Sequence, residues 1–178
     1  MLEARRDLHN AARRFCVGNV PSVQDVAAVL DSISTHFVLF LALDATKVKN
    51  EVLQKIARAL LDRGMVYLCA WGPDCERVHD LVDQQRAPVE PEGEIVMTSW
   101  HSKESLSEAL WFFANCAEPT EGFETTCRDW VAISVANEAW EMEIREGLFE
   151  GKVEEAAPPI KPVSFFKRNF GKSSLPRP

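Results

Sequence analysis

Seven residues with side chains suited to ligand binding or catalysis lie at the ends of apolar runs of strand length, or directly after them. They are Asp44, Trp71, Asp74, Cys75, Ser99, Trp100 and His101. The two tryptophans could stack on a planar ring, and Asp44 or His101 could act as a general acid or base. Helices expected to begin near 74 and 102 could offer backbone N–H groups to an anion. The residue types therefore predict a site for a small molecule, such as a nucleotide.

Each of these residues also has a purely structural interpretation. Asp44 could cap a turn, Gly72-Pro73-Asp74 forms a good strand-to-helix turn, and the tryptophans could simply cover the end of a sheet. Cys75 near a helix N-terminus is expected to have a lowered thiol pKa, and His79 follows one helical turn later. Helical neighbours rarely have the geometry of a nucleophile and its base. No cofactor is expected, and a metal site built on Cys75, His79 and His101 is disfavoured.

Familiar catalytic signatures are absent from the sequence. It has no GxGxxG dinucleotide fingerprint, no GxxxxGK[ST] phosphate loop and no GxSxG nucleophile elbow. Asp44 and Ser99 reproduce part of a receiver-domain site, but no lysine follows a late strand. Whether the chain is an enzyme therefore stays open.

Four apolar runs of strand length predict the sheet that would hold these residues. They cover 37–43, 65–70, 94–99 and 130–135, start roughly 30 residues apart as in βαβ units, and lack strict polar alternation. Helical patterns lie between and after them, at 48–61, 74–85, 103–115 with Ser102 as N-cap, and 137–146. Another helix is expected over 23–33, capped by Pro21-Ser22. The prediction is an α/β fold with a four-stranded parallel sheet, doubly wound as a three-layer sandwich.

Strand order 2-1-3-4 is favoured, with 3-2-1-4 as the alternative. In the favoured order Asp44 and His101 would flank the crevice at the carboxyl ends of the strands, where open α/β sheets bind ligands. The expected organisation is an N-terminal extension at 1–20 with a weak helical pattern, the α/β domain at 21–147, and a Pro-rich linker with a basic tail at 148–178.

Charge and cysteine content narrow the classes of function. Residues 1–14 carry a net charge of +2 and residues 156–178 of +5, so the total of −7 leaves −14 on residues 15–155. An acidic body argues against nucleic-acid binding. Five scattered cysteines indicate reduced thiols, and no apolar run reaches the ~20 residues of a membrane span, so a cytoplasmic protein is expected.

The strings WGPDCERVHD (71–80) and TSWHSKESLSEALWFFANCAEP (98–119), followed by DWVAISVANEAW (129–140), resemble a family of small bacterial α/β proteins of unknown function. The resemblance covers roughly 36–147. It implies a Rossmann-like fold and a bacterial or phage origin, and it implies no activity.

Two functions follow as hypotheses. The first is a non-catalytic interaction or regulatory module that binds a protein partner through its acidic body, its tryptophan-bearing edge or the aromatic and basic segment VSFFKRNFGK (163–172). The partner-binding candidates in that segment are Phe165, Phe166, Lys167, Arg168 and Phe170. The alternative is a small-molecule or nucleotide-binding protein with its site at the carboxyl ends of the strands. The oligomeric state is left open.

Overall fold

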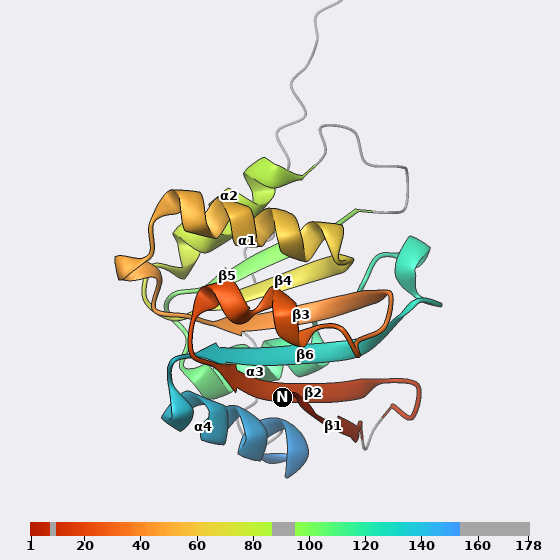
Figure 1. Ribbon diagram of the computed structural model, residues 1–178. Helices are drawn as coiled ribbons and strands as arrows, with labels where there is room; N and C mark the ends of the chain where they lie inside the picture. Colours follow the sequence, from red (N-terminus) through yellow and green to blue (C-terminus); the bar gives the residue numbers. More distant parts are fainter. Residues whose placement is uncertain (8–9, 87–94, 154–178) are drawn as a thin grey trace, which may run out of the picture.

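The computed structural model describes residues 1–7, 10–86 and 95–153. They form one six-stranded sheet in the order β1-β2-β6-β3-β4-β5 (Figure 1). The strands are β1 (Glu3–Arg6), β2 (Arg14–Val20), β3 (His36–Ala42), β4 (Met65–Trp71), β5 (Met97–His101) and β6 (Cys127–Val135). All neighbouring strands are parallel except β1 and β2, which are antiparallel. The basic tail and its partner-binding candidates lie outside the described residues.

The four predicted strands are all present, and three of them form the centre of the sheet. Leu39 of β3 lies between Leu68 of β4 and Val131 of β6, and all three side chains are buried. These strands are buried on both faces, which explains why their sequences read as continuous apolar runs rather than alternating ones.

The favoured strand order was wrong. The predicted first, second, third and fourth strands are β3, β4, β5 and β6, and they lie in the order 3-2-1-4, which was the alternative. The sheet also has six strands and is mixed rather than four-stranded and parallel. The two additional strands come from residues 1–20, where a weak helical pattern was expected: β2 pairs with β6 and β1 closes the edge.

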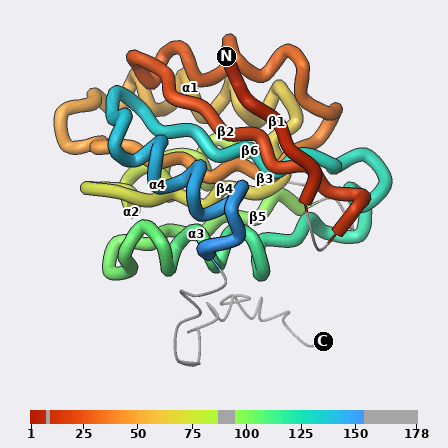
Figure 2. Tube along the Cα trace, turned by 90° about the horizontal axis from the view of Figure 1, so that it is seen from below, coloured from red at the N-terminus to blue at the C-terminus, as the bar shows by residue number. Residues whose placement is uncertain are grey.

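Two helical layers sandwich the sheet (Figures 1 and 2). One contains α1 (Asn50–Asp62), α2 (Cys75–Gln85) and the short 3-10 helices η1 (Val23–Asp25) and η2 (Ala27–Val29). The other contains α3 (Leu106–Asn115) and α4 (Glu138–Phe149). Two further 3-10 turns are η3 (Ala45–Lys47) and η4 (Glu121–Phe123). The single helix expected over 23–33 is therefore replaced by two short 3-10 turns, η1 and η2.

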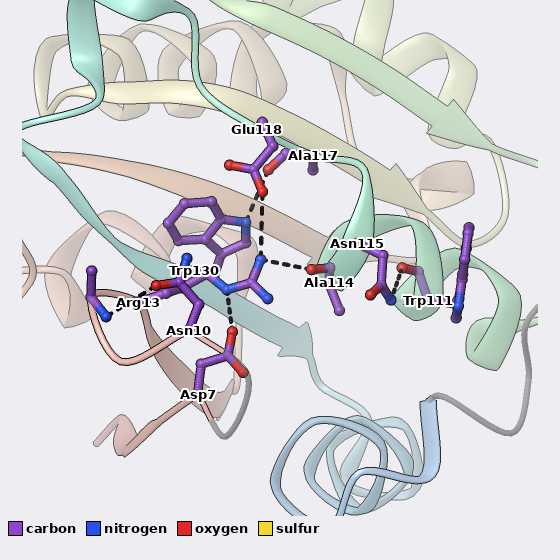
Figure 3. A network of polar contacts seen from close by, with 10 residues as sticks. Asp7, Asn10, Arg13, Trp111, Ala114, Asn115, Ala117, Glu118 and Trp130 are labelled. Carbon is purple, nitrogen blue, oxygen red and sulfur yellow. Dashed lines mark hydrogen bonds and ion pairs between the residues drawn. The ribbon is translucent and has the colours of Figure 1, made fainter.

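Two arginines attach the N-terminal strands to the rest of the domain. Arg14 forms a two-pronged ion pair with buried Asp129, at 2.7 and 2.8 Å, and Asp129 also accepts the Ser34 N–H at 2.7 Å. Arg13 donates to Asp7 at 2.5 Å and to the Ala114 carbonyl of α3 at 2.7 Å (Figure 3). The first twenty residues are thus integrated into the sheet and its α3 side.

No helix in the described ranges is both long and apolar enough to cross a membrane.

Candidate functional site

The observed strand order moves the crevice at the carboxyl ends of the strands. Chain connections leave β3 and β6 toward opposite faces of the sheet, so the switch point lies between these neighbours. It is flanked by Asp44 after β3 and Asn137 after β6. The expectation that Asp44 and His101 would flank it was wrong, because β4 separates β3 from β5.

The polar groups at this switch point are engaged in local caps. Asp44 accepts the Thr46 hydroxyl at 2.5 Å and the Thr46 N–H at 3.0 Å, and these hydrogen bonds lower the pKa of Asp44. Asn137 accepts the Trp140 N–H at 3.1 Å and caps α4, as the sequence indicated. The two side chains therefore begin η3 and α4.

The two edge tryptophans lie on opposite faces of the sheet. Trp71 is edge-to-face with Trp140 of α4, with centroids 5.1 Å apart, and its indole N–H donates to the Glu104 carbonyl at 3.0 Å. Trp100 lies 4.5 Å from the ring of His79 in α2. One ring thus belongs to the α3–α4 layer and the other to the α1–α2 layer, and they cannot clamp one ligand between them.

Ser99 and His101 lie on the α3 side of the sheet. The Ser99 hydroxyl is 3.1 Å from Nε2 of His101, and the His101 ring is 4.8 Å from that of Phe112. His101 is buried, and burial lowers its pKa. It is therefore a buried histidine that packs against α3.

Cys75 does not have the lowered pKa expected from its place at the start of α2. Its thiol is buried in the α1–α2 core, and burial raises the pKa more than nearby backbone hydrogen bonds lower it. The His79 ring instead contacts Trp100 and places Nδ1 3.0 Å from Asp80. Across the described ranges, no group of three His, Cys, Asp or Glu side chains has the geometry of a metal site.

Asp74 belongs to an arginine network that sequence reasoning missed. Its backbone is left-handed, with φ of 63°, and its carboxylate accepts Nε of Arg77 at 2.7 Å. Arg77 also donates to the Asn50 side chain at 2.7 Å and to the carbonyls of Val48 and Ala45. The available signal was the i, i+3 pair of Asp74 and Arg77 at a helix start. The network fixes the loop between β3 and α1 against α2.

The seven predicted residues therefore share an edge of the sheet but not a cavity. Several of them pack into one or the other helical layer or cap a turn. Their role in ligand binding stays a prediction.

The solvent side of α3 and α4, which faces away from the sheet, forms a surface that the sequence did not indicate. We define the α3–α4 face as the solvent side of these helices together with the turns that precede them. On α3, Trp111 and Phe112 are half-buried, and on α4 Trp140 is half-buried while Met142 is 62% exposed. The buried side of α3 is itself apolar, with Leu110 and Phe113 inaccessible to solvent. Helix α3 is thus apolar on nearly all sides, which is unusual for a surface helix.

Local sequence explains why α3 forms despite this composition. Ser105 caps the helix and accepts the N–H of Glu108, whose carboxylate in turn accepts the Ser105 N–H at 2.8 Å. This capping box starts the helix three residues later than the predicted cap at Ser102. The aromatic residues at 111 and 112 then fall at the two flanks of the buried stripe, where neither is fully covered.

The segments that contain α3 and α4 are also acidic. Segments 102–118 and 137–153 carry eight carboxylates and three basic residues, a net charge of −5, and Arg5 and Arg13 from the N-terminal region contact Phe149 of α4 and the Ala114 carbonyl of α3. Two of these bases are already paired: Arg145 with Glu141 and Glu3, and Lys152 with Glu146 and Glu150. The helical segments of the opposite layer, 21–35, 44–63 and 74–86, carry nine acids and seven bases, a net charge of −2.

An open depression of about 390 Å³ lies at the amino ends of the strands, between Ile33, His36 and Arg63. The Arg63 guanidinium donates to the carbonyls of Leu30 and Ile33 at 2.6 and 3.0 Å. The Arg63 cation is therefore used to hold the loop that precedes β3. The depression also lies at the amino ends of the strands, whereas ligands of open α/β sheets usually bind at the carboxyl ends.

Fold and topology define a doubly wound α/β domain with a mixed six-stranded sheet between two helical layers. The chain belongs to the family described as "Domain of unknown function (DUF7684)", whose model matches residues 19–150. This agrees with the expected family of unknown function and with its α/β fold. No curated protein matches the sequence.

Among solved structures, a similar chain is that of "UDP-N-acetylmuramoyl-L-alanyl-D-glutamate--2, 6-diaminopimelate ligase". The TM-score is 0.47 at 16% identity, over 84% of this chain and 31% of that one. The chain thus spans about a third of the ligase chain's length. A likeness this distant says nothing about the activity of this chain.

Proposed function

We propose that this chain is a non-catalytic protein-interaction module whose docking surface is the α3–α4 face. Its partner would be a protein segment that combines aromatic with lysine or arginine side chains. The observation that carries the proposal is the pair of half-buried rings, Trp111 and Phe112, on a surface helix whose flanking segments are rich in carboxylates.

Aromatic rings at a surface are well suited to anchor a partner. Trp and Tyr are enriched at the energetic centres of interfaces, because a large, rigid ring gains much contact area at little entropic cost. A surrounding acidic field would speed the encounter with a basic segment and disfavour acidic ones. The exposed Met142 adds an adaptable apolar contact on α4.

The polar residues at the carboxyl edge support catalysis less well. Asp44 and Asp74 accept hydrogen bonds from their own neighbours, and the Cys75 thiol is buried with a raised pKa. An activated nucleophile needs the opposite conditions, namely an accessible thiol with a lowered pKa.

Peptide selection tests the proposal. Random peptides displayed on phage would be selected on the wild-type protein and synthesised, and their affinity measured by titration calorimetry. We expect enrichment of peptides with aromatic and basic residues, and a loss of about thirtyfold, or about 2 kcal/mol, on Trp111→Ala. Trp100→Ala, which alters the opposite face, serves as the matched control and should bind normally.

Two outcomes would count against the proposal. One is a set of selected peptides without basic or aromatic preference. The other is equal binding by wild type and Trp111→Ala with loss on Trp100→Ala, which would move the site to the α1–α2 side. A companion thermal-shift screen with nucleotides and common metabolites tests the alternative, a small-molecule site at the carboxyl edge.

A further inference from the structure

We infer that the α3–α4 face is occupied in the free protein by the chain's own segment 163–172, VSFFKRNFGK, which an external partner must displace. The inference rests on the proposed function because it uses the same docking surface. It adds to that proposal the identity of the segment that covers the surface, so that the protein's own tail regulates the binding of an external partner.

The place where the described chain ends supports this assignment. Val153 is buried in the same apolar cluster as Leu110 of α3 and Ile144 of α4. At Gly147 the two helices meet: a side-chain carbon there would lie 3.4 Å from Leu110 and 3.8 Å from Val153. Figure 2 shows the described chain ending beside α3. The C-terminal segment therefore begins next to α3 and α4, the two helices that carry the proposed docking surface.

The length of the intervening chain is sufficient. Phe165 lies twelve positions after Val153, and each step can span up to ~3.3 Å, so the reach is about 40 Å. The ten residues of α3 extend only about 15 Å. A short tether also keeps the segment at an effective concentration on the order of millimolar, which favours the intramolecular contact over a free competitor.

The composition of the segment complements the surface. Phe165, Phe166 and Phe170 supply rings for the aromatic residues of the face, and Lys167, Arg168 and Lys172 supply positive charge without any acid. The face provides the rings of Trp111 and Phe112, and the segments that contain α3 and α4 carry a net charge of −5. The opposite layer, at −2, lacks comparable exposed rings among its described residues apart from the half-buried Trp100.

Fluorine NMR of the full-length chain labelled with 5-fluorotryptophan tests the contact. Trp111→Phe and Trp100→Phe assign the two resonances that matter. We expect the triple variant Phe165→Ser, Phe166→Ser and Phe170→Ser to shift the Trp111 resonance toward its solvent-exposed position and leave Trp100 unchanged. Lys167→Glu with Arg168→Glu should act in the same direction, and Leu175→Ser, outside the segment, should change neither resonance.

The selected peptides then measure the regulation. If the segment leaves the face free in about a tenth of molecules, these peptides should bind the triple variant about tenfold more tightly than wild type. A Trp111 resonance that is identical in wild type and triple variant would overturn the inference. A shift that disappears when the wild type is diluted would also overturn it, because the segment would then come from a second copy.

The two proposals fail in different ways. Peptides that bind the α3–α4 face equally in wild type and triple variant leave the interaction module intact and reject the intramolecular occupant. The opposite outcome is a Trp111 resonance that depends on the tail while no peptide binds, even to the triple variant. That outcome rejects the interaction module and makes the contact between tail and face a purely structural one.

Discussion

The two helical layers differ in the side chains that they expose to solvent. Helix α1 buries Leu53, Ala57 and Leu60, and its exposed residues are mainly charged. Helix α3 buries Leu110 and Phe113 and also carries two partly exposed rings on its outer flanks. Both layers cover the apolar sheet, but the partly exposed apolar side chains of α1 are aliphatic, whereas those of α3 are aromatic.

Under the proposed function, this difference separates stability from recognition within one domain. Covering the sheet requires only a buried apolar stripe, and large rings that remain partly exposed beside that stripe are typical of interaction surfaces. The α3–α4 layer keeps such rings and surrounds them with carboxylates. We interpret the α1–α2 layer as the structural cover and the α3–α4 layer as the working surface.

The largest expected effect tests whether both layers belong to one cooperative core. Phe113 is completely buried, so Phe113→Ala should lower the free energy of unfolding by about 3–5 kcal/mol. Leu60→Ala on α1 should cost about 2–5 kcal/mol. Urea unfolding monitored by circular dichroism measures both. A loss below about 1 kcal/mol for Phe113→Ala would show that α3 is not part of the core.

The second effect concerns the buried ion pair that joins β2 to β6. Burial disfavours the charged form of Asp129, but the hydrogen bonds from Arg14 and Ser34 outweigh it, so the pKa of Asp129 is lowered. Asp129→Asn should cost about 1.5–3 kcal/mol at neutral pH.

The pH dependence of that cost has a defined sign. A lowered pKa in the folded state stabilises the protein above the ordinary pKa of about 3.9, and this contribution is lost as the pH falls through the folded value. Unfolding curves of wild type and Asp129→Asn should therefore converge on acidification. The exposed pair of Asp62 with Arg58 is the control, and Asp62→Asn should change little. A pH-independent difference for Asp129→Asn would contradict the account.

A third, smaller effect compares acidic residues of the two layers. Glu143 on α4 and Glu51 on α1 are both exposed. Glu143→Lys should weaken binding of a basic selected peptide by about fivefold, or about 1 kcal/mol, and added salt should reduce the difference. Glu51→Lys should leave the affinity unchanged in titration calorimetry. Equal losses for both variants would mean that only net charge matters.

A further comparison concerns stability at the working surface. Because Trp111 is only partly buried and packs at the margin of the α3–α4 cluster, Trp111→Ala should lower the free energy of unfolding by clearly less than Phe113→Ala does, although it weakens peptide binding. Phe113→Ala, two residues away, provides the contrast. A Trp111→Ala loss comparable with that of Phe113→Ala would identify Trp111 as a core residue and remove the basis for the docking surface.

The central strands could be predicted from sequence because they are buried on both faces. Their order could not, since periodicity within a strand does not specify its neighbour. Strand β2 was missed because Gly18 and Asn19 interrupt its apolar run and because its partner β6 lies more than a hundred residues away. Pairing with β6, rather than local preference, makes residues 14–20 a strand.

The direction of the edge side chains also depended on sheet register. Trp71 pairs with His101, and Ala70 pairs with Trp100. Successive side chains of a strand point to opposite faces, so this register places Trp71 and His101 on one side and Trp100 on the other. The sequence indicated that these residues lie at one edge of the sheet. Which of them share a face depends on the pairing register, because a shift by one residue moves a side chain to the opposite face. The buried stripe of α3, by contrast, was predictable because it follows helical periodicity alone.

The most direct test of the central claim is a chemical-shift map of the uniformly 15N-labelled protein titrated with a selected basic, aromatic peptide. We predict that the perturbed amides cluster in segments 105–115 and 138–150, with the Trp111 indole N–H among the largest shifts. Perturbations concentrated on α1 and α2, or at residues 44 and 71–75 of the carboxyl edge, would contradict the assignment of the α3–α4 face as the docking surface.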